Sequence, residues 1–317
     1  MTDTQNDVFK TPVNKIRLFE HGAPGSQNLK LTRKYYTEDM PDGRVKHIVQ
    51  NITDPDIVPY IPDGIGNSTD RQRIPAVLII PGGAFRRLVY NFEGEDVAKW
   101  LNSMGIAAFV LECRLPSDEH DNAEDVPLID AMRAMRVIRG RAQEFGIDEA
   151  KIGVMGFSAG GFMAALLSTA YESDVYADYK YKDEYDKLSA RPDFAVCSYP
   201  VISIDDCIEA GKRYMSEEQV LERISDSKAK ILHKYNPDKL VRPDMPPVFI
   251  CETDDDRTTL SENSVGFYMA ARKAGVSAEL HIFRTGGHGY GCGDDFAQTG
   301  EWKVLFTKWI KSIGIIS

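Results

Sequence analysis

From residue 76 onwards, short apolar runs rich in β-branched residues alternate with longer amphipathic stretches, and this alternation limits the possible folds more than any other feature. Apolar runs without a polar face are typical of parallel strands that are covered on both sides. Strands that alternate with helices predict an α/β fold whose central sheet is mostly parallel and carries helices on both faces. The expected strands are 76–80, 106–113, 152–155, 194–199, 248–251 and 278–283, and the expected helices are 93–104, 128–145, 159–170, 261–274 and 302–313.

The domain organisation follows from length and from two breaks in this pattern. A chain of 317 residues suits one large α/β domain, and 43% hydrophobic residues are enough for a large core, so we expect a single domain over 1–317. Residues 1–70 are polar and rich in turns, which predicts an N-terminal arm with the first strands. Between 201 and 247 a charge-rich helical stretch interrupts the alternation, and this interruption predicts a lid inserted over the sheet.

Charge and composition exclude several classes of partner. Lys and Arg number 38 and Asp and Glu number 48, so the net charge of −10 would repel a nucleic-acid backbone. The first ten residues lack the apolar core of a signal peptide, and the longest apolar runs are too short to span a bilayer. The five cysteines form no C-x-x-C pair. We therefore expect reduced thiols, no metal site, a cytoplasmic location, and neither a membrane nor a nucleic-acid partner.

The segment Gly156–Gly160 reads G-F-S-A-G and lies between the expected strand 152–155 and the expected helix 159–170. That position is the one that a G-x-S-x-G nucleophile elbow requires. The glycines permit a tight turn that presents Ser158 at the edge of the sheet, and the N–H of Ala159 then points towards the place where an oxyanion develops. Ser158 is therefore the candidate nucleophile.

A second glycine pair follows the first expected strand, in the segment Ile80–Phe85. Gly-Gly by itself is a general turn signal. Its position after a parallel strand and before the nucleophile in the chain instead favours an oxyanion loop, in which the backbone N–H groups of Gly82 and Gly83 stabilise developing negative charge.

A serine hydroxyl needs a base, and the base needs a carboxylate that orients it. Of the six histidines, His288 lies in the glycine-rich segment Thr285–Gly291 after the last expected strand, where packing gives no reason for an imidazole. The acidic loop Glu252–Arg257 lies between the nucleophile and this histidine in the chain, which gives the order Ser, Asp, His. The loop contains three adjacent aspartates, and the pattern alone does not decide between them.

With these motifs the chain resembles the α/β-hydrolase family, in the branch of small-molecule carboxylesterases, acetyl esterases and acetyl-xylan-esterase-like proteins. The resemblance runs from about residue 76 to the C-terminus and includes Gly286–Gly289, which reads Gly-Gly-His-Gly. It implies the α/β-hydrolase fold with its lid insertion. In this family the carboxylate lies seven residues before an Asn-Ser pair such as Asn263–Ser264, which implies Asp256, with Asp255 as the second choice.

Two positions depart from the pattern of the family that the chain resembles. Ala84 stands where a further glycine is usual, and this departure implies a narrower acyl side of the oxyanion loop. Thr259-Leu260 stands where Val-Pro is common. The second departure leaves the register of the acidic loop open between Asp255 and Asp256.

The residues and the resemblance together predict a carboxylic ester hydrolase that works through an acyl-enzyme, with Ser158 as nucleophile, His288 as base and then acid, and Asp256 as the orienting acid. This mechanism needs no cofactor. The resemblance implies short acyl esters as substrates, namely acetyl groups on sugars or xylo-oligosaccharides. Two alternatives stay open: a serine peptidase of the prolyl-oligopeptidase type, against which the length argues, and a non-catalytic ligand-binding protein with a hydrolase fold.

Four aromatic residues are candidates for lining the substrate site and stacking on a sugar, although each of them also suits an ordinary core position. They are Phe85, Tyr90, Tyr199 and Tyr290. A small-molecule ester is the partner that the sequence predicts, and the oligomeric state is left open.

Overall fold

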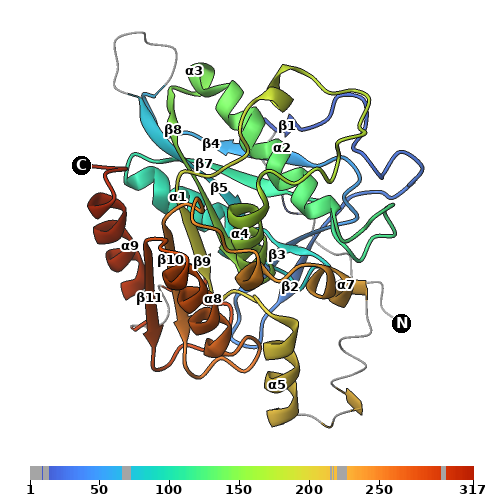
Figure 1. The fold of residues 1–317 in the computed structure, drawn as a ribbon. Coiled ribbons are helices and arrows are strands. Elements are labelled where there is room, and N and C mark those ends of the chain that lie inside the picture. The colour runs from blue at the N-terminus through green and yellow to red at the C-terminus, as the bar shows by residue number, and fades with distance from the viewer. Residues whose placement is uncertain are drawn as a thin grey trace.

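The computed structural model describes residues 9, 14–65, 73–214, 216, 218–219, 227–293 and 298–317 (Figure 1). These residues form a central sheet of eight strands in the order β1-β4-β7-β5-β8-β9-β10-β11. The strands are β1 (Ile16–Arg17), β4 (Asp56–Tyr60), β5 (Ile74–Ile80), β7 (Ala107–Glu112), β8 (Ile147–Phe157), β9 (Ala195–Ser198), β10 (Val248–Thr253) and β11 (Ala278–Phe283). Neighbours are antiparallel at β1–β4 and β4–β7 and parallel elsewhere, which confirms the predicted, mostly parallel sheet.

Helices cover both faces of the central sheet, as the sequence predicts. They are α1 (Asp96–Ser103), α2 (Val126–Gly140), α3 (Ala142–Phe145), α4 (Ala159–Ala170), α8 (Ser261–Lys273) and α9 (Glu301–Ser312). α2 and α4 pack together on one face, and α1 and α9 meet on the other through Trp100 and Trp302 (Figure 1). The stretch 128–145, expected as one helix, is divided between α2 and α3 because the backbone leaves helical geometry at Arg141.

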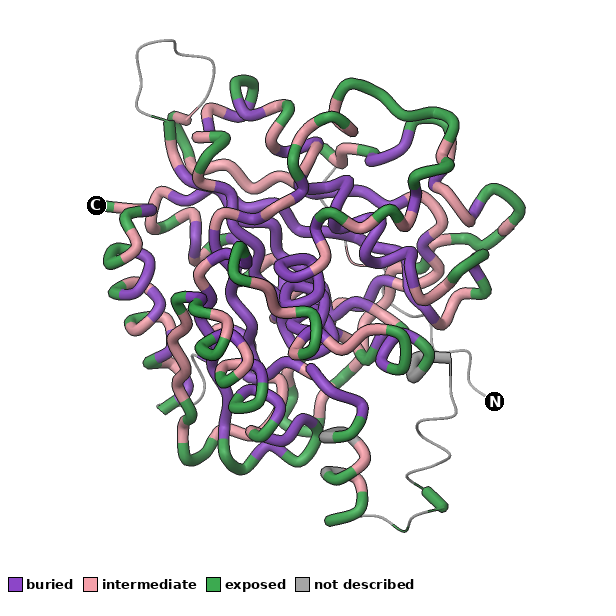
Figure 2. Tube along the Cα trace, in the orientation of Figure 1, coloured by how far each residue is buried: buried purple, intermediate pink, exposed green. Residues whose placement is uncertain are grey.

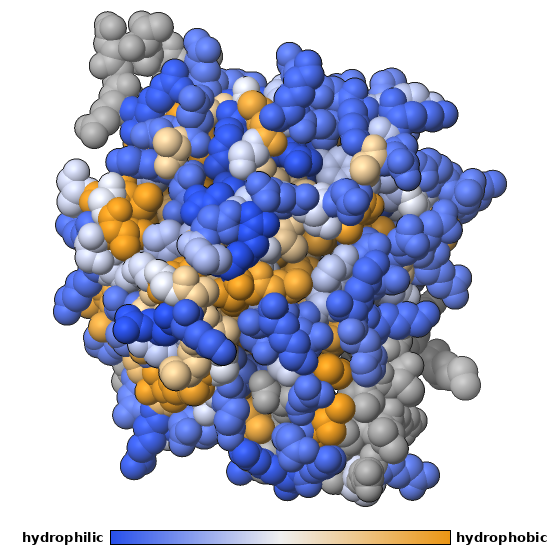
Figure 3. All heavy atoms as spheres, viewed as in Figure 1, coloured by the Kyte–Doolittle hydropathy of each residue, from blue (hydrophilic) through white to orange (hydrophobic). Residues whose placement is uncertain are grey.

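The hydrophobic core lies on both sides of the central sheet. Buried residues run along the central strands and the inner sides of the helices, and exposed residues lie on the outer sides (Figure 2). β7 and β10 are buried along their whole length, which explains their continuous apolar runs. On the surface seen in Figure 3, hydrophilic side chains predominate and apolar ones form small separate patches. None of the described helices has both the length and the apolar character needed to cross a membrane.

The N-terminal arm contributes two strands to a second, antiparallel sheet. The sequence predicts strands in the arm, but it does not indicate that they form a sheet of their own. Its strands are β2 (Lys34–Asp39), β3 (Val45–Gln50) and β6 (Leu88–Val89). β2 and β3 form a hairpin whose turn is closed by the N–H of Met40 and the carbonyl of Arg44. Because β6 follows directly after the expected oxyanion loop Ile80–Phe85, this sheet brings the arm next to the candidate site.

Buried charges fasten the arm to the central sheet. The Glu112 carboxylate, at the end of β7, accepts hydrogen bonds from Lys15 at 2.6 Å and from Arg33 at 2.7 Å. The side chain of Glu112 is fully buried, and both cations come from the arm. Charge-assisted hydrogen bonds of this kind are among the stronger polar contacts in a protein. They add to the buried apolar side chains through which the arm joins the core.

A second buried ion pair lies beside the first. The Arg114 guanidinium pairs with Asp130 of α2 at 2.6 Å, and neither side chain is exposed. Arg114 also donates to the Ser26 hydroxyl of the arm at 2.8 Å, and that hydroxyl lies 3.0 Å from His120 Nδ1. Together these ion pairs form the anchor cluster, which consists of Lys15, Arg33, Glu112, Arg114 and Asp130.

The stretch 201–247, predicted to be a lid, includes helical segments and a short 3₁₀ turn among its described residues. They are α5 (Ile204–Tyr214), α7 (Ser227–Lys234) and η3 (Pro237–Lys239). At its end, α7 is tied to the region of α2 by an ion pair of 2.7 Å between Lys234 and Asp125. Residues 215, 217 and 220–226 lie outside the described residues, and the lid function stays a prediction.

Candidate active site

Ser158 lies at the sharp turn between β8 and α4. Its backbone φ is +54°, in the left-handed region that residues with a side chain rarely adopt. Two close approaches shape the turn: a Cβ on Gly156 would lie 1.9 Å from the carbonyl oxygen of Gly160, and a Cβ on Gly160 would lie 1.9 Å from that of Ile80. Only glycine fits at both positions, and the resulting turn presents the Ser158 hydroxyl at the carboxyl end of β8.

Three side chains that are distant in sequence form one series of hydrogen bonds. Ser158 Oγ lies 2.9 Å from His288 Nε2, and His288 Nδ1 lies 2.6 Å from Asp256 Oδ2. The side chain of His288 is 22% exposed and that of Asp256 is 0% exposed, so the imidazole connects a buried carboxylate to the accessible part of the site. This is the arrangement of a nucleophile, a base and an orienting acid.

The two aspartates between which the sequence leaves a choice have different neighbours. Asp256 is buried, and its Oδ1 accepts two backbone N–H groups of its own loop, at 2.7 and 2.9 Å. Burial by itself would raise the pKa of Asp256, but the hydrogen bonds from His288 and from these N–H groups outweigh burial and lower the pKa. Asp255 is exposed and accepts the N–H of Gly287 at 2.8 Å, so it fastens the loop that carries His288.

The three expected oxyanion donors differ in what they face. The N–H of Gly82 donates to Glu93 Oε2 at 2.8 Å and is therefore engaged within the protein. Among the described residues, no acceptor is paired with the N–H groups of Gly83 and Ala159. The expectation for Gly82 is thus corrected: its N–H holds the loop in place, and Gly83 and Ala159 are the donors that an oxyanion could use.

The oxyanion loop is held in an unusual backbone conformation. Gly83 has a φ of +139°, and Ala84 and Phe85 have φ values of +57° and +59°. A residue with a Cβ adopts such values at a cost of roughly 1 to 2 kcal/mol, which glycine avoids. The strained conformation therefore gives a physical reason for the glycine that is usual at the position of Ala84.

Glu93 belongs to the site although no sequence motif indicates it. It lies in the π-helical turn η1 (Asn91–Glu95), where the sequence predicts the start of an ordinary helix, and its side chain is buried. Besides the N–H of Gly82, Glu93 accepts the Tyr199 hydroxyl at 2.9 Å, and that hydroxyl accepts the N–H of Gly291 at 3.0 Å. Glu93 therefore joins the oxyanion loop to the histidine loop.

Burial also shifts the pKa of Glu93. Desolvation raises the pKa of Glu93, and the charge of His288 with the hydrogen bonds from Tyr199 and Gly82 partly offsets this increase.

In the sequence, Glu93 stands out only as an acidic residue at the start of an expected helix. Ordinary helix starts carry the same signal, because acidic residues there complement the helix dipole.

A cavity of about 250 Å³ lies beside Ser158 and His288, and we call it the site cavity. The N-terminal arm supplies part of its wall through Met40, Arg44 and Lys46. None of the described residues between 201 and 247 lines it, whereas the hairpin of β2 and β3 contributes to its wall. Sequence patterns could not reveal this, because the arm carries no motif that connects it to the nucleophile.

The four aromatic candidates for substrate stacking do not line the site cavity. Tyr90 and Tyr199 are 0% exposed, Tyr290 is 4% exposed and Phe85 is 6% exposed. They are core aromatics, and their expected role in substrate binding is corrected. The aromatic side chain that does line the site cavity is Phe92, which lies in the π-helical turn next to Glu93.

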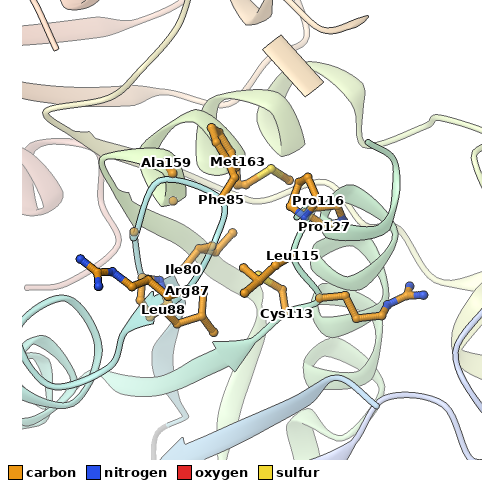
Figure 4. A pocket seen from close by; sticks show the side chains of 14 residues that line it. Ile80, Phe85, Arg87, Leu88, Cys113, Leu115, Pro116, Pro127, Ala159 and Met163 are labelled. Carbon is orange, nitrogen blue, oxygen red and sulfur yellow. The ribbon is translucent and has the colours of Figure 1, made fainter. Parts of the chain in front are cut away.

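Phe85 instead lines a second cavity, behind the oxyanion loop (Figure 4). Figure 4 labels Phe85, Met163 and Leu115 among the side chains that line this cavity. Its volume of about 10 Å³ leaves room for no more than one water-sized group. Ser158 does not line it, so the site cavity is where an ester can meet the nucleophile.

The site thus brings together a serine hydroxyl, an imidazole, a buried carboxylate and two N–H groups for which the described residues supply no acceptor. Such an arrangement can attack a carbonyl carbon, stabilise negative charge on the carbonyl oxygen and move a proton to a leaving group. Among the residues that the structure describes, no three His, Cys, Asp or Glu side chains are grouped as metal ligands would be.

The sequence is similar to one family model and to parts of two longer proteins. The BD-FAE family model matches residues 65–270, which is more than half of the chain. An acetylxylan esterase of Xylanibacter ruminicola is 31% identical over 240 residues, which cover 75% of this chain and 45% of that protein. An endo-1,4-beta-xylanase B of Butyrivibrio fibrisolvens is 31% identical over 227 residues, which cover 71% of this chain and 34% of that protein. The chain spans less than half of the length of these curated relatives.

Solved structures resemble the chain over nearly its whole length. An acetyl ester-xyloside bifunctional hydrolase from Caldicellulosiruptor lactoaceticus is 34% identical, with a TM-score of 0.72 and coverage of 96% of this chain and 97% of that chain. A thermophilic esterase from Thermogutta terrifontis with bound propionate is 24% identical, with a TM-score of 0.64 and coverage of 93% and 96%. The second likeness concerns the fold alone.

Proposed function

This chain belongs to the BD-FAE family and has the α/β-hydrolase fold, and from that premise we propose that it is a serine esterase for short acyl esters, with acetylated xylo-oligosaccharides as its substrates. The observation that carries the proposal is the hydrogen-bonded series of Ser158, His288 and Asp256, with distances of 2.9 and 2.6 Å. A serine in a left-handed conformation against a partly exposed histidine has no packing role that would maintain it.

In the first half-reaction, Ser158 Oγ attacks the ester carbonyl carbon while His288 Nε2 accepts its proton. Asp256 keeps the proton on Nδ1, so that Nε2 is free to act as the base, and it stabilises the imidazolium that forms. The N–H groups of Gly83 and Ala159 donate to the tetrahedral oxyanion. The imidazolium then protonates the alcohol oxygen, the C–O bond breaks, and the acyl group stays on Ser158.

Water completes the second half-reaction. His288 accepts a proton from a water molecule as its oxygen attacks the acyl carbonyl, and the same two N–H groups hold the second oxyanion. The bond to Ser158 Oγ breaks, and the imidazolium returns its proton to that oxygen. The carboxylic acid leaves, and the side chains are back in their starting protonation states.

The relatives and the site cavity support a short acyl group on a sugar. The relatives named above include an acetylxylan esterase and an acetyl ester-xyloside bifunctional hydrolase. At about 250 Å³, the site cavity is small compared with typical ligand pockets. Arg44, Lys46 and Arg87 in its wall supply hydrogen-bond donors, which suit an alcohol rich in hydroxyl groups better than a long acyl chain.

Hydrolysis of p-nitrophenyl esters from acetyl to octanoyl tests the reaction class. We expect the highest kcat/KM with acetyl, and a loss of more than about a thousandfold in Ser158→Ala, because no other group replaces the nucleophile. Ser168→Ala is the matched control, since Ser168 is buried in the same helix and donates to the carbonyl of Ala164 at 2.7 Å. Wild-type activity in pure Ser158→Ala protein would refute the mechanism.

Acetate release from acetylated xylo-oligosaccharides tests the substrate class. The comparison is with gluco-oligosaccharides of the same length and degree of acetylation, and we expect a higher kcat/KM for the xylose series. Equal values for both series would contradict the xylose specificity and leave the esterase proposal intact. Activity on no ester, with Ser158 still labelled by a phosphonate, would favour the peptidase alternative instead.

A further inference from the structure

We propose that Thr259 is a positioning residue of the triad, whose side-chain hydroxyl holds the Asp256 carboxylate and the His288 ring in one fixed arrangement. The inference rests on the proposed function, because it concerns the same triad. It adds a fourth side chain that does not touch the substrate and acts through two that take part in the reaction.

The Thr259 hydroxyl has three polar neighbours. Thr259 Oγ1 lies 2.9 Å from Asp256 Oδ2, 3.2 Å from His288 Nδ1 and 3.3 Å from the carbonyl oxygen of Tyr199. Thr259 is 1% exposed, so water does not compete for this hydroxyl. The hydroxyl therefore lies against the two atoms that Asp256 and His288 use to bind each other.

The single proton of this hydroxyl has one best acceptor. The carboxylate oxygen of Asp256 is both charged and the nearest of the three neighbours. The O–H therefore donates to Asp256 Oδ2, and a lone pair of Thr259 Oγ1 faces the N–H at His288 Nδ1. Asp256 Oδ2 then accepts one proton from each side, which fixes the carboxylate relative to the imidazole ring.

The turn of the acidic loop does not depend on this hydroxyl. Asp256 Oδ1 accepts the backbone N–H groups of Thr258 at 2.7 Å and of Thr259 at 2.9 Å, and these bonds close the loop. A valine at this position would keep both N–H groups and nearly the same volume, but it would lose the contact at Oδ2. Thr259→Val thus separates the effect on the triad from the folding of the loop.

The hydroxyl also moderates the charge that His288 faces. A donor at Asp256 Oδ2 stabilises the carboxylate and weakens its pull on the shared proton. Without this donor, Asp256 holds the imidazolium more strongly, so the acid limb of the pH profile moves to higher pH. The substitution leaves the other titratable groups around these side chains in place. They include the acidic and phenolic groups Glu93, Tyr199, Glu252, Asp255 and Tyr290 and the basic groups Arg44, Lys46 and Arg87 of the site cavity.

The test compares the wild type with Thr259→Val and Thr259→Ser in pH profiles of kcat/KM for p-nitrophenyl acetate. Phosphonate labelling of Ser158 counts the active sites, so misfolded protein does not lower kcat. We expect Thr259→Val to lose roughly tenfold in kcat and to shift the acid limb upward by about half a pH unit. Thr259→Ser keeps the hydroxyl and should stay close to the wild type in both respects.

Thr169→Val is the matched control for the loss of a buried threonine hydroxyl. Thr169 is 3% exposed, and its hydroxyl donates to backbone carbonyls within α4 at 3.1 Å. Removing the Thr169 hydroxyl should change only the thermal unfolding temperature, and only slightly, because a bond from threonine to the preceding helical turn adds little to the stability of a helix. The acid limb should stay where it is in the wild type.

An unchanged acid limb and kcat in Thr259→Val would overturn the inference. Equal losses in Thr259→Val and Thr259→Ser would overturn it too, because packing alone would then explain both. If Thr259→Val does not fold, Thr259→Ala replaces it with the same expectations. A wild type that hydrolyses no ester and takes no phosphonate label would refute the proposed function. The role of Thr259 would then be tested by the low-field NMR resonance of the His288 Nδ1 proton, which Thr259→Val must move and Thr259→Ser must not.

Discussion

The anchor cluster and the triad both use buried carboxylates, but these carboxylates have different partners. In the anchor cluster, Glu112 meets ammonium and guanidinium groups and Asp130 meets a guanidinium group, and such cations keep their charge over the whole working pH range. In the triad, Asp256 meets an imidazole, a group whose charge changes readily in this range. Permanent charges hold segments of the chain together, whereas a partner that changes its charge can move protons.

The two regions also differ in how far they exclude water. Both Arg114 and Asp130 are fully buried, whereas His288 keeps part of its side chain exposed above a buried Asp256. A sealed pair leaves an uncompensated charge when one partner is removed, which is costly for the fold. When one partner of a partly exposed pair is removed, turnover is lost before stability. Substitutions in the two regions should therefore separate stability from turnover.

Asp256→Asn should have the largest effect, and that effect should be on turnover. The amide keeps the size of the side chain, but it no longer holds the proton on His288 Nδ1, so Nε2 is not available as the base. We expect kcat for p-nitrophenyl acetate to fall by about 10⁴-fold. The free energy of unfolding, measured in urea, should change by about 1 kcal/mol or less.

Asp255→Asn is the neighbouring control for this substitution. Asp255 is exposed and accepts the N–H of Gly287, a bond that an asparagine oxygen can also accept. Turnover should stay within about threefold of the wild type, as for a surface polar group. Similar losses in Asp255→Asn and Asp256→Asn would remove the distinction between the two aspartates on which the triad assignment depends.

Asp130→Asn should have the opposite profile. It leaves the Arg114 guanidinium buried without its carboxylate, which typically costs about 3 to 5 kcal/mol of stability. The kcat per labelled Ser158 should stay unchanged at temperatures where the variant is folded. Glu144→Gln, in the partly exposed pair with Arg141, should cost less than about 1 kcal/mol. A large fall in kcat for Asp130→Asn would show that the anchor cluster also shapes the site.

The parts of the site that the sequence predicts are those encoded within a few residues. Ser158 and its glycines form a short segment between a buried strand and a helix, and local sterics determine that turn. His288 stands out in the same way within the glycine-rich Thr285–Gly291. Choosing Asp256 needed a family resemblance, because adjacent aspartates look alike until the fold turns one of them inward.

The parts that sequence patterns missed depend on contacts between distant residues. Glu93 and Tyr199 are 106 positions apart, and only the packed fold makes them partners. Nothing in the polar arm indicates that Met40 would line a cavity beside Ser158. The stacking role expected for the aromatic candidates failed for a related reason: a side chain's chemistry can be read from the sequence, but its exposure is decided by tertiary packing.

His120, which lies beside the anchor cluster, should make the free energy of unfolding depend on pH. Burial, followed by the charge of Arg114, lowers the pKa of His120 from 6.5 to about 4. Folding therefore favours the neutral ring, so this contribution to stability is complete above about pH 6.5 and is lost as the pH falls through 4. Between pH 7 and pH 4 the wild type should lose about 3 kcal/mol relative to His120→Asn, measured by urea unfolding. A constant difference between the two proteins would contradict the buried neutral ring.

Glu252→Gln should have the smallest effect on turnover. It tests the comparison directly because Glu252 is a buried carboxyl that no described cation neutralises. Burial, followed by the charge of Asp256, raises the pKa of Glu252 well above its ordinary value, so folding favours the protonated carboxyl. Its oxygens accept the N–H of Thr253 at 2.9 Å and the hydroxyl of Ser264 at 3.2 Å. A glutamine reproduces this neutral shape.

At about pH 4, where the unfolded chain also largely keeps the proton on Glu252, Glu252→Gln should therefore unfold within about 1 kcal/mol of the wild type. At pH 7 the unfolded wild type ionises while the raised pKa opposes ionisation in the folded chain, so the variant should be the more stable protein, and its pH profile should keep the acid limb. Folding favours the protonated acid, so the wild type should lose stability relative to the variant as the pH rises towards the raised pKa of Glu252. Urea unfolding of both proteins between pH 4 and pH 9 measures this trend. A loss of several kcal/mol at pH 7 would mean that Glu252 is ionised beside Asp256, and permanent cations would then no longer distinguish the anchor cluster from the triad.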